Sequence, residues 1–265
     1  MQPDQDPIRW NAHVGDYERM FEPLTNAFAA QALAALAPLP GMALLDLAAG
    51  SGGAALLAAQ AGAIVTAVDG SAGMVARIMS RAAGLPITAL QQDGMALDLP
   101  DASFDRALSC FGVVLFPEPG RGMDGLYRVL RPGGRAAIVT WTEPQRYELS
   151  ARLRAATLGI MGAVPQAALP AQLRYIDPDL LSALLTQAGF DDVRIEPLQG
   201  RITAHSAEVL TSALGFAPGM AATLDALGAH RAEVLRAFTA GLQQDFGAGP
   251  VSLGAVAHMA IGVRP

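Results

Sequence analysis

The chain has 265 residues, a formal net charge of −6 and a hydrophobic fraction of 52%. This length suits one large domain with a sizeable core, and the absence of a basic run argues against a nucleic-acid partner. All 18 basic residues are arginine, which excludes P-loop and Schiff-base lysine chemistry. The one cysteine, Cys110, excludes an internal disulfide and a multi-cysteine metal site, so we expect no bound metal.

The longest apolar stretch, roughly 27–49, contains two prolines and Asp46, so we expect no membrane-spanning helix and no membrane partner. The first residues carry acids and no basic stretch, so we expect no signal peptide and a cytoplasmic location. The sequence leaves the oligomeric state open between a monomer and a homodimer.

The first half of the chain alternates between predicted strands and helices. Residues 1–10 are predicted to form a loose tail, within an N-terminal helical segment that covers 1–40. Strands are predicted at 42–47, 63–69, 86–91, 104–110 and 135–141, and helices at about 53–61, 71–83 and 120–130. The alternation predicts a parallel sheet that is covered on both faces.

The second half is mostly helical. Helices are predicted at about 147–162 and 177–188, strands at 193–203 and 252–263, and further helices through 206–246. Some forty helical residues between two strands are too many for an ordinary connection. We therefore interpret 143–175 and 206–248 as a helical cap for the substrate, within a single domain that spans 1–265.

The chain is organised around residues 42–53, where a buried strand leads into a glycine-rich turn. Residues 50–55 fit the dinucleotide pattern G-x-G-x-x-A, which is a weak signal by itself. Asp46 lies within the strand end, where a dehydrogenase usually keeps apolar residues. Asp69 ends the next strand, near the offset of about 20 residues expected of a ribose-binding acid, and Asp93 follows the third strand.

Four motifs together resemble the class I S-adenosylmethionine-dependent methyltransferases, especially the ubiquinone/menaquinone-biosynthesis-like group (methyltransferase type 11), which acts on small molecules. Leu44–Gly52 resembles V-L-D-L-G-C-G-T-G, and Val68–Ser71 resembles V-D-x-S. Leu99–Asp105 resembles L-P-F-x-D-x-S-F-D, and Leu126–Gly134 resembles E-x-x-R-V-L-K-P-G-G. The motifs cover 42–141, which we identify as the cofactor-binding core.

The resemblance implies an α/β fold with a Rossmann-like, seven-stranded, doubly wound sheet, in which the last strand is antiparallel. It implies S-adenosylmethionine as the cofactor and transfer of a methyl group, by in-line displacement, to an O, N or C acceptor on a small molecule. The predicted helical cap favours an apolar or aromatic metabolite as that acceptor. The cofactor-binding residues that it implies are Tyr17, Asp46, Ala48, Ala49, Gly50, Ser51, Gly52, Asp69, Gly70, Met74, Asp93, Gly94, Met95, Cys110 and Phe111.

Within that set, the first strand and its turn would hold the methionine part, and Asp69 would bind the ribose. Gly70 and Met74 would line one side of the adenine, and residues 93–95 the other. Cys110 and Phe111 would border the sulfonium. The chain departs from the family pattern at Ala48 and Ala49, which replace Gly-Cys.

Two histidines are candidate general bases. His205 is the leading candidate, because it follows the sixth predicted strand at the predicted rim of the active site. His13 lies four residues before Tyr17, and the two share one face if the first helix starts early. Each has a simpler interpretation as a surface or helix-capping histidine. The aromatic residues predicted to form an apolar acceptor pocket, unless they only pack the core, are Trp10, Phe116, Trp141 and Tyr175.

Two other functions stay open at this point. One is an NAD-dependent oxidoreductase, although Asp46, Asp93 and Arg131–Gly134 count against it. The other is a protein that binds S-adenosylmethionine without methylating. The predicted cap favours a small-molecule acceptor over a protein or RNA substrate.

Overall fold

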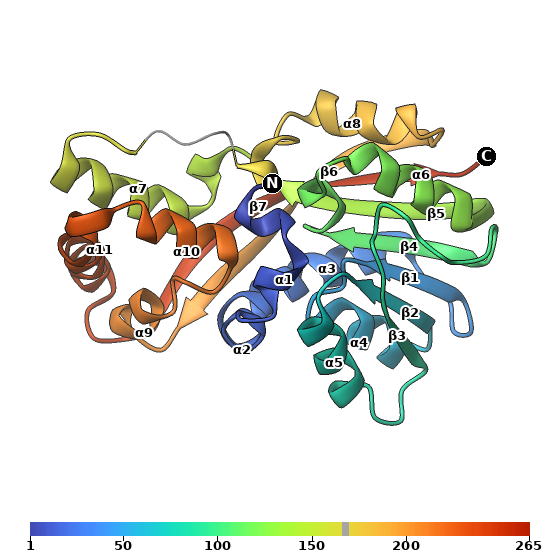
Figure 1. Ribbon diagram of the computed structural model, residues 1–265, viewed down its shortest axis with the longest axis horizontal. Helices are drawn as coiled ribbons and strands as arrows, with labels where there is room; N and C mark the ends of the chain where they lie inside the picture. Colours follow the sequence, from blue (N-terminus) through green and yellow to red (C-terminus); the bar gives the residue numbers. More distant parts are fainter. Residues whose placement is uncertain (166–169) are drawn as a thin grey trace.

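The computed structural model describes residues 1–165 and 170–265 and contains one seven-stranded sheet (Figure 1). The strand order is β3-β2-β1-β4-β5-β7-β6. The strands are β1 (Ala43–Leu47), β2 (Ile64–Asp69), β3 (Ile87–Gln91), β4 (Phe104–Cys110), β5 (Leu130–Trp141), β6 (Asp191–Ala204) and β7 (Val251–Val263). The strands β1 to β5 pair in parallel, and β7 runs antiparallel to β5 and to β6. The predicted fold class is therefore confirmed.

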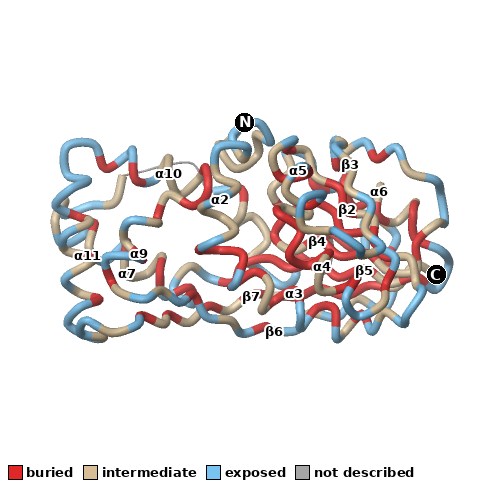
Figure 2. Tube along the Cα trace, turned by 90° about the horizontal axis from the view of Figure 1, so that it is seen from below, coloured by how far each residue is buried: buried red, intermediate tan, exposed pale blue. Residues whose placement is uncertain are grey.

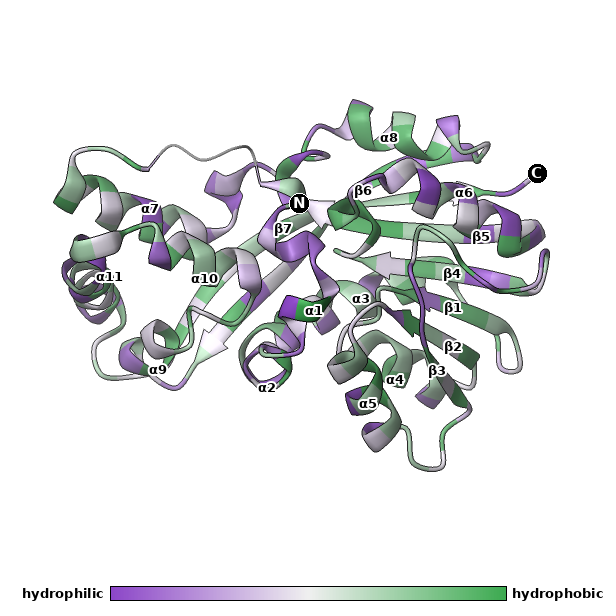
Figure 3. Cartoon of the chain, viewed as in Figure 1, coloured by the Kyte–Doolittle hydropathy of each residue, from purple (hydrophilic) through white to green (hydrophobic). Residues whose placement is uncertain are grey.

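Helices cover both faces of this sheet. One face carries α3 (Glu22–Leu36) and α4 (Gly53–Gln60), and α5 (Ala72–Arg81) packs against β2 and β3. The other face carries α6 (Pro119–Val129) and α8 (Pro178–Gln187). Buried residues concentrate in the part of the molecule that contains the parallel strands and these helices (Figure 2), and apolar residues follow the parallel strands (Figure 3). Each face has its own hydrophobic cluster, as expected of a doubly wound sheet.

Local sequence signals explain most element boundaries. The Ser71 hydroxyl accepts a hydrogen bond from the Met74 N–H and begins α5, as predicted from its capping preference. The Asp177 carboxylate accepts from the Asp179 N–H and begins α8. The strand β5 begins at Leu130, earlier than predicted, because Gly133 and Gly134 exchange backbone hydrogen bonds with Arg264.

The prediction of a loose tail at residues 1–10 is wrong. This region forms η1 (Pro3–Gln5) and α1 (Pro7–Trp10), and the chain continues through α2 (Val14–Asp16) and a π-helical turn, η2 (Tyr17–Phe21). The Asp4 carboxylate accepts a hydrogen bond of 2.6 Å from the Gly219 N–H, and the Asn11 side chain accepts one of 2.8 Å from the Gly73 N–H. These contacts hold residues 2–21, which we call the N-terminal segment, against two distant helices.

The remaining helices gather at one end of the sheet. They are α7 (Glu148–Met161), α9 (Ala207–Ser212), α10 (Pro218–Asp225) and α11 (Arg231–Phe246). They pack around the part of the antiparallel β6–β7 pair that extends beyond β5 (Figure 1). Residues 251–256 of β7 lie past the register with β5 and pair with β6, and Ala255 also forms a bridge with Tyr147. Across the described residues, no helix has the length and hydropathy needed to span a membrane.

Candidate functional site

The turn between β1 and α4 has an unusual backbone. Gly50 and Gly52 have φ angles of 57° and 91°, which glycine adopts without strain. Ala48 has a φ of 58°, a left-handed conformation in which a Cβ atom is unfavourable. The family pattern has glycine at this position, so the structure gives a physical reason for that glycine. Backbone strain of this kind concentrates at functional sites.

Two carboxylates meet beside this turn. The Asp69 carboxylate accepts hydrogen bonds of 2.8 Å from the N–H groups of Gly50 and Ser71. Burial nevertheless raises the pKa of Asp69 to about 6. Asp46 is 1% exposed, and burial together with the nearby Asp69 charge raises its pKa to about 7. The Oδ2 atom of Asp46 has no hydrogen-bond partner among the described residues.

A small cavity of about 20 Å³ lies against Asp46. Its lining includes Ala48 and Ala49 of the turn, Cys110 at the end of β4, Tyr17 of the N-terminal segment and Glu22 at the start of α3. Strand order explains this meeting, because β1 lies between β2 and β4 and their carboxyl ends share one edge. A buried carboxylate oxygen without a partner, facing a cavity at that edge, marks a site for a ligand.

Side chains from elsewhere lie directly on several predicted site positions. A Cβ atom placed on Gly70 would lie 2.9 Å from the Pro7 Cβ, and one placed on Gly94 would lie 2.3 Å from the Phe116 ring. The Tyr17 ring covers Gly50 in the same way, at 3.4 Å. The strand ends are thus covered by the N-terminal segment and by the loop after β4.

The other predicted residues lie around this edge. Met74 is buried in α5, whereas Asp93 is exposed and accepts a hydrogen bond from the Met95 N–H. Phe111 follows Cys110 and has a φ of 60°, which is rare for a bulky residue. The structure therefore brings Asp46, Asp69 and Cys110 together and leaves Asp93 at the outer side.

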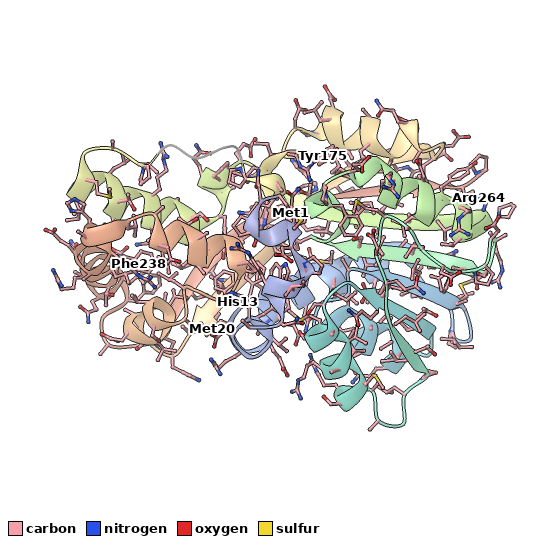
Figure 4. The ribbon with its side chains drawn as sticks, in the orientation of Figure 1. Met1, His13, Met20, Tyr175, Phe238 and Arg264 are labelled. Atoms are coloured by element: carbon pink, nitrogen blue, oxygen red, sulfur yellow. The ribbon has the colours of Figure 1, made fainter. Side chains whose placement is uncertain are left out.

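The two candidate histidines lie far apart. His205 is exposed and directly follows Ala204, the last residue of β6. Ala204 pairs with Val251 of β7, whereas the last residue of β5, Trp141, pairs with Ala257, six residues further along β7. At about 3.3 Å per residue, this places His205 roughly 20 Å past the end of β5. His13 lies where the N-terminal segment meets the cap helices (Figure 4), and its Nδ1 is 2.9 Å from the Gly215 carbonyl oxygen.

The aromatic residues expected in one pocket are divided between the two faces of the sheet. Trp10 and Trp141 pack against one hydrophobic cluster, and Phe116 and Tyr175 pack against the other. The sequence did not reveal a different grouping, which we call the aromatic cluster: Phe21, Phe111, Trp141, Tyr147 and Phe216. Its ring centroids are 4.5 Å apart for Phe111 and Trp141, 4.6 Å for Trp141 and Tyr147, and 4.6 Å for Phe21 and Phe216.

Comparison with known proteins decides the family. A family model described as a methyltransferase domain matches residues 45–138. An uncharacterized protein of Mycobacterium tuberculosis is 37% identical over 131 residues, which is 49% of this chain and 48% of the relative, so the match spans about half the relative's length. The demethylmenaquinone methyltransferase of Clavibacter sepedonicus is 34% identical over 200 residues, covering 71% of this chain and 82% of that enzyme.

The chain belongs to the class I S-adenosylmethionine-dependent methyltransferases. It is of the ubiquinone/menaquinone type, as its motifs predicted. The fold is similar to that of Haemonchus contortus phosphoethanolamine N-methyltransferase 2 in complex with S-adenosylmethionine. That likeness has a TM-score of 0.56 and 17% identity, and it covers 98% of this chain and 57% of the other.

The side chains of this methyltransferase fit its cofactor, S-adenosylmethionine. The ligand carries positive charge on its sulfonium and ammonium groups, which complements the unpartnered Asp46 oxygen and the neighbouring Asp69. Asp46, at the end of β1, would repel the pyrophosphate of NAD, whereas Asp69 suits the ribose of either ligand. The oxidoreductase alternative is therefore not favoured.

Proposed function

We propose that this methyltransferase methylates an O, N or C atom of a small, planar and largely apolar metabolite. The aromatic cluster carries the proposal. It begins at Phe111, the neighbour of the cavity residue Cys110, and continues through Trp141 to Tyr147 at the start of α7. These rings stack on one another in the structure, and once separated they would offer a flat acceptor aromatic faces and apolar burial.

The division of labour follows from the cofactor. When bound, S-adenosylmethionine supplies a methyl group that its sulfonium already activates. The protein then has to bind the cofactor, orient the acceptor and exclude water. We assign binding to Asp46, Asp69 and the backbone of residues 48–52, and orientation of the acceptor to the aromatic cluster. The helices α7 and α9–α11 would form the substrate cap, in line with the two segments predicted from the sequence.

His13 is the better-placed candidate base for an acceptor that must lose a proton. A carbonyl oxygen only accepts hydrogen bonds, so the contact with Gly215 requires hydrogen on Nδ1 and leaves the lone pair on Nε2. His13 also belongs to the segment that carries Phe21 of the aromatic cluster. His205, which follows the end of β6 beyond β5, has no such relation to the cavity. We therefore do not retain it as the leading base.

The name of the Clavibacter relative suggests the first acceptor to test, demethylmenaquinone. The enzyme would be incubated with S-adenosylmethionine labelled in its methyl group, with demethylmenaquinone or with a metabolite extract. We expect label in an organic-soluble product. Binding of the cofactor with no labelled product in either incubation would favour the non-methylating alternative.

The two histidines provide a matched pair for the same assay. We expect His13→Ala to slow turnover by about 10²–10⁴-fold without changing cofactor affinity, the usual contribution of a general base. His205→Ala should leave turnover unchanged. The reverse ranking would contradict the assignment of His13. A cytoplasmic location and the choice between monomer and homodimer stay predictions from the sequence.

A further inference from the structure

Two acidic and two basic side chains join the N-terminal segment and α3 to α5. Glu18 lies in the π-helical turn η2 and Glu22 is the first residue of α3. Arg77 and Arg81 lie four residues apart on one side of α5, which faces both acids. In the outer pair, Arg77 donates two hydrogen bonds of 2.6 Å to Glu18. In the inner pair, Arg81 donates hydrogen bonds of 2.7 Å and 2.9 Å to the two carboxylate oxygens of Glu22.

The inner pair also holds the glycine-rich turn. The Ser51 hydroxyl donates a hydrogen bond of 2.6 Å to Glu22, and the Ser51 carbonyl oxygen accepts one of 2.9 Å from Arg81. Ser51 is fully buried and lies between Gly50 and Gly52, the two glycines with positive φ. Its side chain and its carbonyl are thus both held by the same ion pair, between two glycines whose backbone could otherwise adopt other conformations.

Burial makes the inner pair much more consequential than the outer one. The side chains of Glu22 and Arg81 are 7% and 20% exposed, whereas those of Glu18 and Arg77 are 24% and 41% exposed, and Glu22 also lines the cavity beside Asp46. A buried carboxylate that loses its cation is left uncompensated, while an exposed pair contributes little. The inner pair therefore restrains the turn through its contacts with Ser51, and the outer pair contributes less.

We propose that Glu22 and Arg81 are positioning residues for the cofactor. They act through Ser51 to hold the turn in the conformation that receives the amino-acid end of S-adenosylmethionine. This inference rests on the proposed assignment of residues 48–52 to the methionine part. It gives a specific role to residues outside the motifs that define the family resemblance.

Calorimetry with two ligands tests the inference. S-adenosylhomocysteine has both the adenosine and the amino-acid end, whereas 5′-methylthioadenosine lacks the amino-acid end. We expect Glu22→Gln and Arg81→Met to raise the Kd of S-adenosylhomocysteine at least tenfold and to change the Kd of 5′-methylthioadenosine less than twofold. Arg77→Met, in the more exposed outer pair, is the matched control for Arg81→Met and should change neither Kd by more than twofold.

Ser51→Ala provides a test that creates no buried charge imbalance. It removes only the hydroxyl that contacts Glu22, and it should weaken S-adenosylhomocysteine selectively by severalfold. Equal loss of both ligands in these variants would show a purely structural role and overturn the inference, as would unchanged affinity for both. If the wild-type protein bound neither ligand, the cofactor assignment itself would fail, independently of any variant.

Discussion

Asp46 is the residue whose protonation most directly links the fold to the ligand site. Its carboxyl group is buried, one oxygen has no partner among the described residues, and its pKa is raised to about 7. An unfolded chain would have a pKa of about 3.9 at this position. Folding therefore favours the protonated form, and ionisation opposes folding.

The pH dependence of stability follows from this sign. The contribution of Asp46 is fully present below about pH 4 and is lost as the pH rises through about 7. Relative to Asp46→Asn, the wild-type protein should lose up to about 4 kcal/mol of unfolding free energy over that range, since one pKa unit corresponds to about 1.4 kcal/mol. Urea denaturation at several pH values measures the difference. Asp124→Asn, an exposed substitution, is the control, and a pH-independent offset for Asp46→Asn would contradict the expectation.

Ala48 allows a second test at the residue scale. Because its φ is 58°, replacing it with glycine removes an unfavourable Cβ contact, and we expect Ala48→Gly to stabilise the protein by about 1 kcal/mol. Its neighbour Ala49 is not among the residues with positive φ, so Ala49→Gly should destabilise by up to about 1 kcal/mol. Thermal or urea unfolding compares the two. Destabilisation by both substitutions would show that the strain at Ala48 is compensated.

At the scale of elements, local patterns were sufficient for the first four parallel strands, whereas β5 begins earlier than predicted. The bounds of β4 match the prediction, because apolar runs between turn residues specify buried strands without reference to distant partners. The proximity of Asp46 and Asp69 was predictable for the same reason, since strand-end positions in a parallel sheet share an edge.

The N-terminal segment shows why the rest could not be predicted. Asp4 contacts a residue 215 positions away and Asn11 contacts one 62 positions away, so no local periodicity signals their role. The position of His205 depends on how far the antiparallel strands β6 and β7 extend past β5, and that distance is set by the register between β5 and β7. The spacing of Glu18 and Glu22, matched by that of Arg77 and Arg81, was the one available signal for the ion pairs.

We expect this segment to control access to the site. The cavity of about 20 Å³ is far below the roughly 300–1,000 Å³ of small-molecule sites, so we expect the segment to move when the cofactor enters. Asn11 holds the segment through hydrogen bonds with Ser71 and Gly73. We expect Asn11→Ala to speed association of S-adenosylhomocysteine severalfold, because such bonds contribute about 1 kcal/mol each.

Stopped-flow fluorescence would measure this association rate. Gln31→Ala is a matched control, because it removes hydrogen bonds between α3 and β6, away from the segment. The control should leave the rate unchanged. An unchanged rate for Asn11→Ala would mean that the cofactor enters by another path.

At the scale of the whole molecule, a Rossmann-like core and a helical cap meet at the carboxyl edge of the sheet. The acids of the core suit a cationic cofactor, and the aromatic cluster between core and cap suits an apolar acceptor. The two demands are met by different parts of the chain. The family motifs therefore predict the cofactor, whereas we expect the acceptor to be selected by the cap and by the N-terminal segment.

Binding of S-adenosylhomocysteine and of NAD to the wild-type protein and to Asp69→Ala, measured by calorimetry, tests the central claim most directly. We predict that the wild-type protein binds S-adenosylhomocysteine and not NAD. We also predict that Asp69→Ala weakens the binding by about 1.5–3 kcal/mol, the contribution of hydrogen bonds to a charged group. Binding of NAD alone, or an affinity for S-adenosylhomocysteine that Asp69→Ala leaves unchanged, would contradict the account.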